Sequence, residues 1–461
     1  MSKLILARTS EDVSLKCSWL TLSLLFIFIC TLFNGFFDTI DVECGYTDFW
    51  QCTTLGEPVD LHADLIKSAL SLASSQPPSL WDWSSHYQAF YLHSAYGKME
   101  DVATGRVTVF GVPPFTLLLL TGTLQGILAT GPVIMVSLYY TTSLILLGAL
   151  CWCLVADLPT RLLAFVVLAF SYPFMLMLMR GNIGALITGG MLISYIYLAC
   201  NKRHLVLACV CLAIACNIRP NTVILAPLLL CFGMRRAIWG SAFFLGLAGS
   251  IAVISYLSVT HLYPGYSFNI FLKALETYER LYVIGPFGNS NNNSAFGAVK
   301  LFCGMCLMNI RVDELRNYNT IILCLSAVMI GYATYRFWRG QLPAYHFAFV
   351  LTCLYILASA VFATYHLLVL YVFILAAGSK TVETGPFPVL LLFMATLVIV
   401  PKNYFYPFPN LSFEVILNPA ILLICVIWVL WLRFPVPDAG QVIGENSRTT
   451  PGRKRRQQAR V

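Results

Sequence analysis

Fifty consecutive residues, 107–156, contain no charged side chain. An earlier uncharged run, 17–37, is long enough to cross a bilayer as one helix, because an α-helix rises about 1.5 Å per residue. Over the whole chain 58% of the 461 residues are hydrophobic and 11% are charged, whereas a soluble domain carries about 25% charged residues. The sequence therefore predicts an all-α polytopic membrane protein.

Short basic segments orient the apolar runs, because cytoplasmic loops of membrane proteins are enriched in Lys and Arg. These segments are the N-terminus, Lys202-Arg203, Arg235-Arg236, Arg336/Arg339 and Arg453–Arg456. The spans that place all of them inside lie near residues 17–37, 132–156, 161–178, 181–199, 204–218, 221–233, 236–260, 318–337, 342–362, 365–379, 385–400 and 413–433. Twelve crossings put both termini in the cytoplasm.

The apolar segment 111–130 is not needed for this count. It is either a re-entrant or surface-lying helix broken by Pro113-Pro114, or a thirteenth crossing that displaces a neighbour. A second break is expected at Arg219-Pro220, because proline removes a backbone donor and clashes one turn back. Broken helices at membrane depth occur where they line a cavity, since lipid cannot satisfy the freed backbone groups.

The chain divides into a cytoplasmic N-terminus (1–16), a transmembrane domain (17–433) and a basic tail (434–461). The tail is expected to be disordered and held near anionic headgroups. The first loop, 38–110, is expected outside the cytoplasm. It holds ten acidic and three basic residues, a formal charge of −7, which makes it the first place to look for chemistry.

The net charge of +8 does not indicate a nucleic-acid partner, because the excess bases sit in short connectors and in the tail. Most of the 16 cysteines lie in or beside apolar spans, where a cysteine is usually a small buried hydrophobe. No spacing is typical of a zinc site, and no metal or other cofactor is expected. Cys44 and Cys52 flank Asp48 in the first loop and could pair as a disulfide if that loop is extracytoplasmic.

The predicted topology places five polar clusters on the outer face, and ionisable residues that share one side of a membrane domain are typical of a site. The clusters are the acidic loop with Asp48, Arg180-Gly181-Asn182, Asn217–Pro220, the loop 261–296 with Asn291–Ser294, and Thr364-Tyr365-His366. Each has a plainer interpretation. Asp48 is one of ten loop acids, the arginines snorkel to headgroups, the asparagine run is a flexible loop, and His366 is a packing residue.

Together these residues favour a particular chemistry. A carboxylate accepts a proton, and arginine's planar, permanently charged fork suits phosphate oxygens. A histidine donates to a leaving-group oxygen or orients a substrate. The combination suits transfer of a group from a phosphate-linked lipid donor to a hydroxyl at the outer face of the membrane.

The chain resembles the membrane glycosyltransferases of the GT-C superfamily, specifically glycosyltransferase family 87, over roughly residues 17–380. The residues that carry the resemblance are Asp48-Phe49, Val112-Pro113-Pro114, Met179–Asn182, Lys202-Arg203, Leu207-Ala208, Arg219-Pro220, Asn293-Ser294 and His366. The best match covers 180–227. The family more often has Lys where Arg219 stands, and its acid has fewer acidic neighbours, so Asp41 and Asp64 are alternatives to Asp48.

The resemblance implies a GT-C fold and an inverting hexosyltransferase that moves a sugar from a polyprenyl-phosphate donor to a lipid or glycan hydroxyl. The favoured sugar is mannose. The resemblance also implies Asp48 as the base. Arg180, Asn182, Arg219 and Asn293 would bind substrate, and His366 would assist at the phosphate or position the sugar. The expected location is the bacterial inner membrane, with the ER as the alternative; only there would the sequons Asn292–Ser294 and Asn410–Ser412 be glycosylated.

A competing function class is a transporter or flippase of a lipid-linked sugar. It would use the same arginines to hold the phosphate but would not need Asp48. A third class is a structural membrane subunit without an active site.

Overall fold

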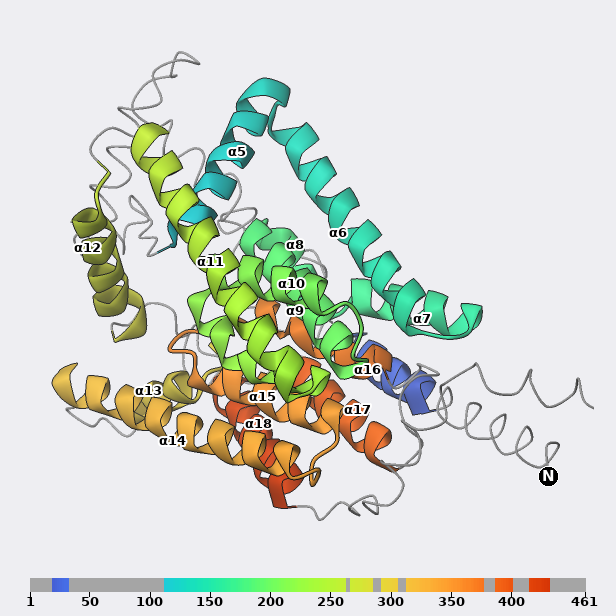
Figure 1. Ribbon diagram of the computed structural model, residues 1–461. Coiled ribbons are helices and arrows are strands. Elements are labelled where there is room, and N and C mark those ends of the chain that lie inside the picture. The colour runs from blue at the N-terminus through green and yellow to red at the C-terminus, as the bar shows by residue number, and fades with distance from the viewer. Residues whose placement is uncertain are drawn as a thin grey trace, which may run out of the picture.

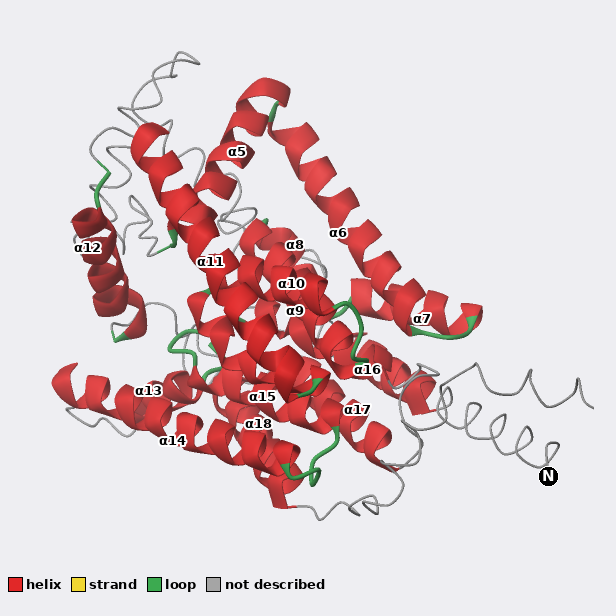
Figure 2. Cartoon of the chain, in the orientation of Figure 1, coloured by secondary structure: helices red, strands yellow, loops and turns green. Residues whose placement is uncertain are grey.

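The structure is a computed structural model that describes residues 19–32, 112–262, 266–284, 292–305, 312–376, 386–400 and 414–431. These residues are almost entirely helical. They form no β-strand beyond an isolated bridge between Asn292 and Ala363 (Figure 2). The first loop with Asp48, Asp41 and Asp64, its Cys44–Cys52 pair and the basic tail lie outside the described residues, so the predictions about them stay predictions.

The first half of the described chain holds one helix in the first apolar run and seven in the next part. They are Trp19–Leu32, α5 (Pro114–Thr130), α6 (Pro132–Leu154), α7 (Leu158–Ala169), α8 (Tyr172–Arg180), α9 (Ile183–Cys200), α10 (Leu205–Ile218) and the 3₁₀ helix η5 (Pro220–Phe232).

The second half of the described chain continues with ten helices, of which α11 and α14 are the longest (Figure 1). They are α11 (Met234–Leu262), α12 (Phe268–Tyr278), the π-helix η6 (Glu279–Val283), α13 (Ala295–Met305), α14 (Val312–Trp338), α15 (Ala344–Ala358), the 3₁₀ helix η7 (Thr364–Leu370), α16 (Tyr371–Ala376), α17 (Pro386–Ile399) and α18 (Glu414–Trp431).

Five of these helices are long and apolar enough to cross a membrane: Val133–Leu154, Ile183–Cys200, Met234–Leu262, Glu314–Trp338 and Glu414–Trp431. The pair α7 and α8 would be a sixth span, bent by 59°. The described residues thus have the helices of a multi-pass membrane protein. The number of crossings and the GT-C fold stay predictions.

Prolines set the breaks between helices. Pro173 stands in the first turn of α8, where proline's missing N–H is unused anyway, and the single span expected over 161–178 is bent there instead of straight. The break predicted at Arg219-Pro220 is confirmed, because α10 ends at Ile218 and η5 begins at Pro220. The 13 residues of η5 reach roughly 26 Å, since a 3₁₀ helix rises about 2.0 Å per residue.

The core forms around α15, which is apolar on every side. All of its residues from His346 to Ala358 are buried, as expected for a helix without a polar stripe. Phe349 meets Phe373 of α16 edge to face, with ring centroids 5.1 Å apart. From α9, the Tyr195 hydroxyl donates to the Leu225 carbonyl of η5 at 3.1 Å. Because α15 also packs on η5 and on α9, the four helices α9, η5, α15 and α16 form one bundle.

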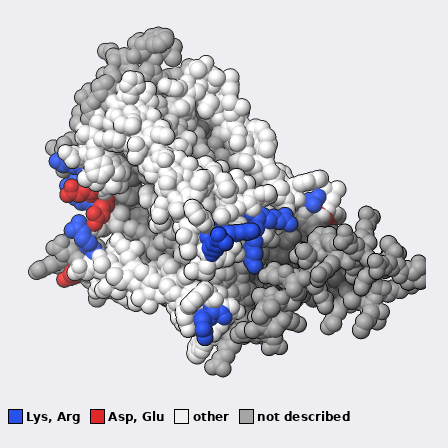
Figure 3. Space-filling model, viewed as in Figure 1, with Lys and Arg blue, Asp and Glu red and all other residues white. Residues whose placement is uncertain are grey.

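One end of this bundle carries the basic connectors. The Asn201 amide donates to the Tyr345 hydroxyl at 3.0 Å, which joins the connector after α9 to the start of α15. Lys202 lies close enough to Cys231, at the end of η5, for its charge to act there. Figure 3 shows Lys and Arg gathered over this end, well apart from a group of mixed charges over α12 and the start of α14. We call the basic end the inner end and the opposite one the outer end.

Which end of the bundle faces the cytoplasm is tested by cysteine labelling. Asn317 at the start of α14 and Arg235 at the start of α11 are both exposed and lie at opposite ends. A membrane-impermeant maleimide added to intact cells is expected to label Asn317→Cys above the unmodified protein, and to label Arg235→Cys only after permeabilisation, because basic ends face the cytoplasm. The reverse pattern would move the outer end to the cytoplasmic side.

Candidate functional site

Arg219 is placed by the break between α10 and η5. Its backbone is extended, with φ −136° and ψ 98°. Its N–H donates to the Ala215 carbonyl at 2.8 Å, and its own carbonyl accepts from the Thr222 hydroxyl at 2.9 Å. The Thr116 hydroxyl at the start of α5 donates to the neighbouring Ile218 carbonyl at 3.3 Å. The backbone is therefore fixed on both sides of the arginine.

The guanidinium of Arg219 sits among aromatic rings at the outer end. Its Cζ lies 5.8 Å from the centroid of the Phe362 ring, within reach of a cation–π interaction. Arg219 also forms a side-chain hydrogen bond with Tyr355, and Tyr278 and His366 lie close enough for its charge to act on them. Nη1 is buried and has no hydrogen-bond partner among the described residues. Arg219 as a whole is half-buried, and the donor on its buried Nη1 suits an oxygen of an anionic ligand.

Asn182 and His366 belong to the same cluster. The Asn182 side chain caps α9 by accepting from the Ala185 N–H at 2.7 Å, and its amide donates to the Tyr365 hydroxyl at 3.3 Å. The Tyr365 ring centroid lies 4.4 Å from that of His366, which in turn lies 5.6 Å from the Phe362 ring. Contacts thus run without interruption from Asn182 to the ring beneath Arg219.

Asn293 holds the loop between α15 and η7. Its backbone N–H donates to the Phe362 carbonyl at 2.7 Å, and its amide donates to the Thr364 hydroxyl at 3.0 Å. The neighbouring Asn292 accepts from the Phe362 N–H at 2.8 Å, which fixes both sides of Phe362. Asn292 is 1% exposed, so the first of the two sequons is closed to glycosylation in the folded protein.

A buried carboxylate, Glu414, completes this part of the site and was missed by the sequence analysis. Its Oε1 accepts from the Thr364 hydroxyl at 2.8 Å and from the Asn418 amide at 3.2 Å. Asn418 also donates to the Asn293 Oδ1 at 2.6 Å. The available signal was an acid at the very start of an otherwise uncharged span, which in lipid is a candidate functional group.

Removing this carboxylate is expected to destabilise the outer end. Glu414→Ala leaves two buried donors, on Thr364 and Asn418, without their acceptor, at a cost of roughly 1–3 kcal/mol each. The measurement is the thermal unfolding of the purified protein in detergent. Glu276→Ala, which removes an exposed acid of α12, is the matched control and should leave the midpoint unchanged. Equal midpoints for the two variants would contradict the network.

Arg180 lies at the last position of α8, two residues before Asn182. The helix ends there because Gly181 takes a left-handed conformation at φ 64°, which glycine adopts without strain. Because Asn182, two residues further on, donates to the hydroxyl of Tyr365 beside His366, Arg180 lies at the same end of the molecule as His366. The structure therefore connects Asn182, Arg219, Asn293 and His366 through Phe362 and Tyr365, and Arg180 lies at the same end. Asp48 lies outside the described residues.

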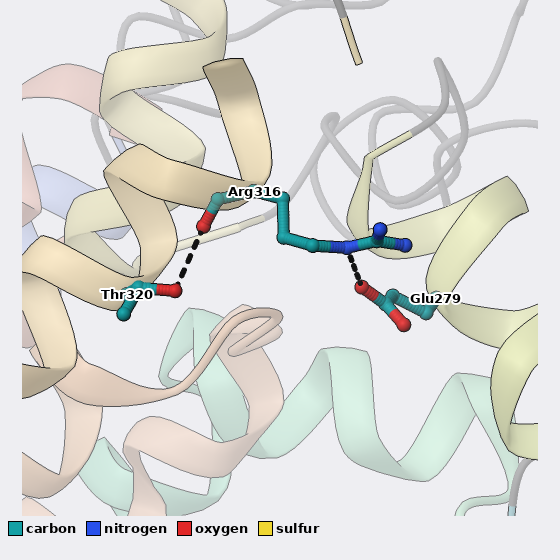
Figure 4. Close-up of polar contacts among 3 residues, drawn as sticks. All are labelled: Glu279, Arg316 and Thr320. Atoms are coloured by element: carbon teal, nitrogen blue, oxygen red, sulfur yellow. Dashed lines mark hydrogen bonds and ion pairs between the residues drawn. The ribbon is translucent and has the colours of Figure 1, made fainter. Parts of the chain in front are cut away.

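The segment that presents Tyr278 to Arg219 is tied to α14. Directly after Tyr278, the Glu279 carboxylate accepts from Arg316 Nε at 3.0 Å (Figure 4). Both side chains are substantially exposed, so this ion pair contributes at most about 1 kcal/mol. Glu279 begins the π-helix η6, a helix type that is rare and frequent at functional sites.

A buried base, Lys300, lies near the outer end, on α13. Lys300 Nζ donates to the Val283 carbonyl of η6 at 2.7 Å and lies 6.0 Å from the Phe296 ring. Burial lowers the pKa of Lys300 to about 8, because the charged form loses its hydration. Sequence analysis did not single it out, since one lysine in a connector between spans is an ordinary feature.

Comparison with known protein families, with curated proteins and with solved structures gave no match. The described residues contain no group of three or more His, Cys, Asp or Glu side chains that could hold a metal ion.

Proposed function

We propose that the protein is an inverting glycosyltransferase. It would move a hexose from a polyprenyl-phosphate donor to a hydroxyl of a lipid or glycan acceptor at the outer face of the membrane. Mannose is the favoured sugar. The observation that carries this proposal is Arg219, whose guanidinium is held among aromatic rings with Nη1 buried and without a hydrogen-bond partner among the described residues. A phosphate oxygen is the partner that such a group accepts best.

In this proposal the acceptor oxygen forms a bond to the anomeric carbon while the bond from that carbon to the phosphate oxygen breaks. Asp48 takes the proton of the acceptor hydroxyl, and polyprenyl phosphate leaves. Arg219, with Arg180 nearby, stabilises the charge that grows on the phosphate. His366 lies beside Arg219 and is suited to contact the same phosphate or the sugar, and Asn182 and Asn293 are placed to fix the rings and loop around it.

The test is transfer by the purified protein. The full chain is reconstituted in vesicles with polyprenyl-phosphate mannose carrying a radioactive sugar, together with lipid and glycan acceptors, and product is counted after separation. We expect sugar on an acceptor and an equal amount of free polyprenyl phosphate. Other hexoses on the same donor establish which sugar is used.

The same arginine would serve a transporter of a lipid-linked sugar. In that case the labelled donor crosses the vesicle bilayer and remains intact, which a sugar-binding probe on the outside detects. Movement of intact donor without any product would therefore overturn the transferase proposal in favour of a flippase.

A further inference from the structure

A groove opens between α6 and α7, away from the site at the outer end. Its volume is about 420 Å³, within the range of roughly 300–1,000 Å³ that is usual for ligand pockets. Of the ten residues that line it, Arg161 is the one that carries a charge, and nearly all of the others are apolar. Gly148 of α6 and Phe165 of α7 form part of its walls.

Arg161 is held firmly at this groove. Its Nε donates to the Val155 carbonyl at 2.7 Å, and its guanidinium carbon stands 4.4 Å above the centroid of the Trp152 ring. No carboxylate among the described residues pairs with it, although Asp157 lies one turn before it and accepts from the Thr160 N–H at 2.9 Å. The terminal nitrogens of the guanidinium therefore keep donors for an external anion.

The groove lies at the inner end of the protein. The bent span formed by α7 and α8 reaches the outer end at Arg180, so the start of α7, with Arg161, lies at the opposite end. Basic side chains gather over that end in Figure 3. A tryptophan and an arginine at the end of a span are typical of the membrane–water interface. The apolar part of the groove would then face the acyl chains of the inner leaflet.

We propose that this groove binds an anionic phospholipid of the inner leaflet, with an acyl chain along Gly148 and Phe165 and the phosphate on Arg161. The apolar walls of the groove match the acyl chain of such a lipid, and the single fixed cation, Arg161, matches its phosphate. Zwitterionic lipids offer the same chains but add a positive group near the arginine. One basic residue near an anionic surface favours an acidic lipid by roughly fivefold. The site is independent of the proposed sugar transfer.

Trp152 makes the proposal measurable, because its ring lines the groove and lipids with brominated chains quench tryptophan only at short range. The full-length protein is reconstituted in phosphatidylcholine vesicles that contain increasing fractions of brominated phosphatidylglycerol or of brominated phosphatidylcholine. The fluorescence of Trp152 is obtained as the difference between the wild type and Trp152→Phe. We expect half-quenching at about fivefold lower mole fraction of the anionic lipid.

Three variants separate the contribution of the lipid headgroup from that of the acyl chain. Arg161→Gln should make the two brominated lipids quench Trp152 equally. Arg161→Lys keeps the charge and should retain part of the preference for the anionic lipid. It also serves to show that the protein tolerates a substitution at this position. Gly148→Leu fills the groove and should weaken quenching by both lipids. Arg235→Gln, which removes an exposed base outside the groove, is the matched control and should behave as the wild type. Equal quenching by both lipids in the wild type, or a preference that survives Arg161→Gln, would overturn the proposal.

Discussion

Asp48→Asn is expected to lower the rate of sugar transfer by about 10²–10⁴, because a positioned base typically contributes that factor. Asparagine keeps the size of the side chain and much of its hydrogen bonding but does not accept the acceptor's proton. Donor binding and the amount of protein in the membrane should stay unchanged. The measurement is the initial rate of transfer in vesicles at saturating donor, with donor binding determined separately.

Other acids of the same loop provide the controls. Asp60→Asn and Asp82→Asn should be nearly silent, because they are expected to be solvated charges. Should Asp41→Asn or Asp64→Asn abolish transfer while Asp48→Asn does not, the base is a different loop acid and the enzyme proposal stands. If no acid of the loop affects transfer, the base assignment fails altogether and the transporter becomes the better interpretation.

Much of the helical arrangement follows from the sequence, because lipid leaves few choices to an uncharged run. The break at Arg219-Pro220 was predictable from proline chemistry alone, and η5 begins at that proline. The bend of 59° between α7 and α8 was not predicted. An apolar run containing Pro173 is compatible with a kink, a bend or a straight helix beginning there, and the choice depends on packing against neighbours such as η7.

The candidate site was predictable as a set of residues but not as a set of contacts. Basic connectors fixed which span ends share a side, so Asn182, Arg219, Asn293 and His366 were expected at one end. Their mutual order depends on Phe362 and Tyr365, aromatic residues that look like ordinary core in the sequence. Glu414 was missed because one carboxylate at a span end is indistinguishable from a solvated one until its donors on Thr364 and Asn418 are seen.

Arg219→Ala is expected to weaken binding of the polyprenyl-phosphate donor by about tenfold to a hundredfold, since a hydrogen bond to a charged group contributes roughly 1.5–3 kcal/mol. The measurement is the donor concentration at half-maximal transfer together with the maximal rate. Arg180→Ala should act in the same direction if its guanidinium reaches the same phosphate. Arg235→Ala removes an exposed base at the inner end and is the matched control, for which neither quantity should change.

Arg219→Lys separates charge from geometry. Lysine restores a positive charge but not the planar fork that pairs two phosphate oxygens, so binding should recover only in part. A loss confined to the donor requirement means that the arginine contacts the phosphate equally before and during transfer, whereas an equal loss in maximal rate means that the contact forms as the phosphate departs. If Arg219→Ala binds and transfers like the wild type, the half-buried Arg219 is a structural group packed on Phe362. The phosphate must then lie elsewhere at the outer end.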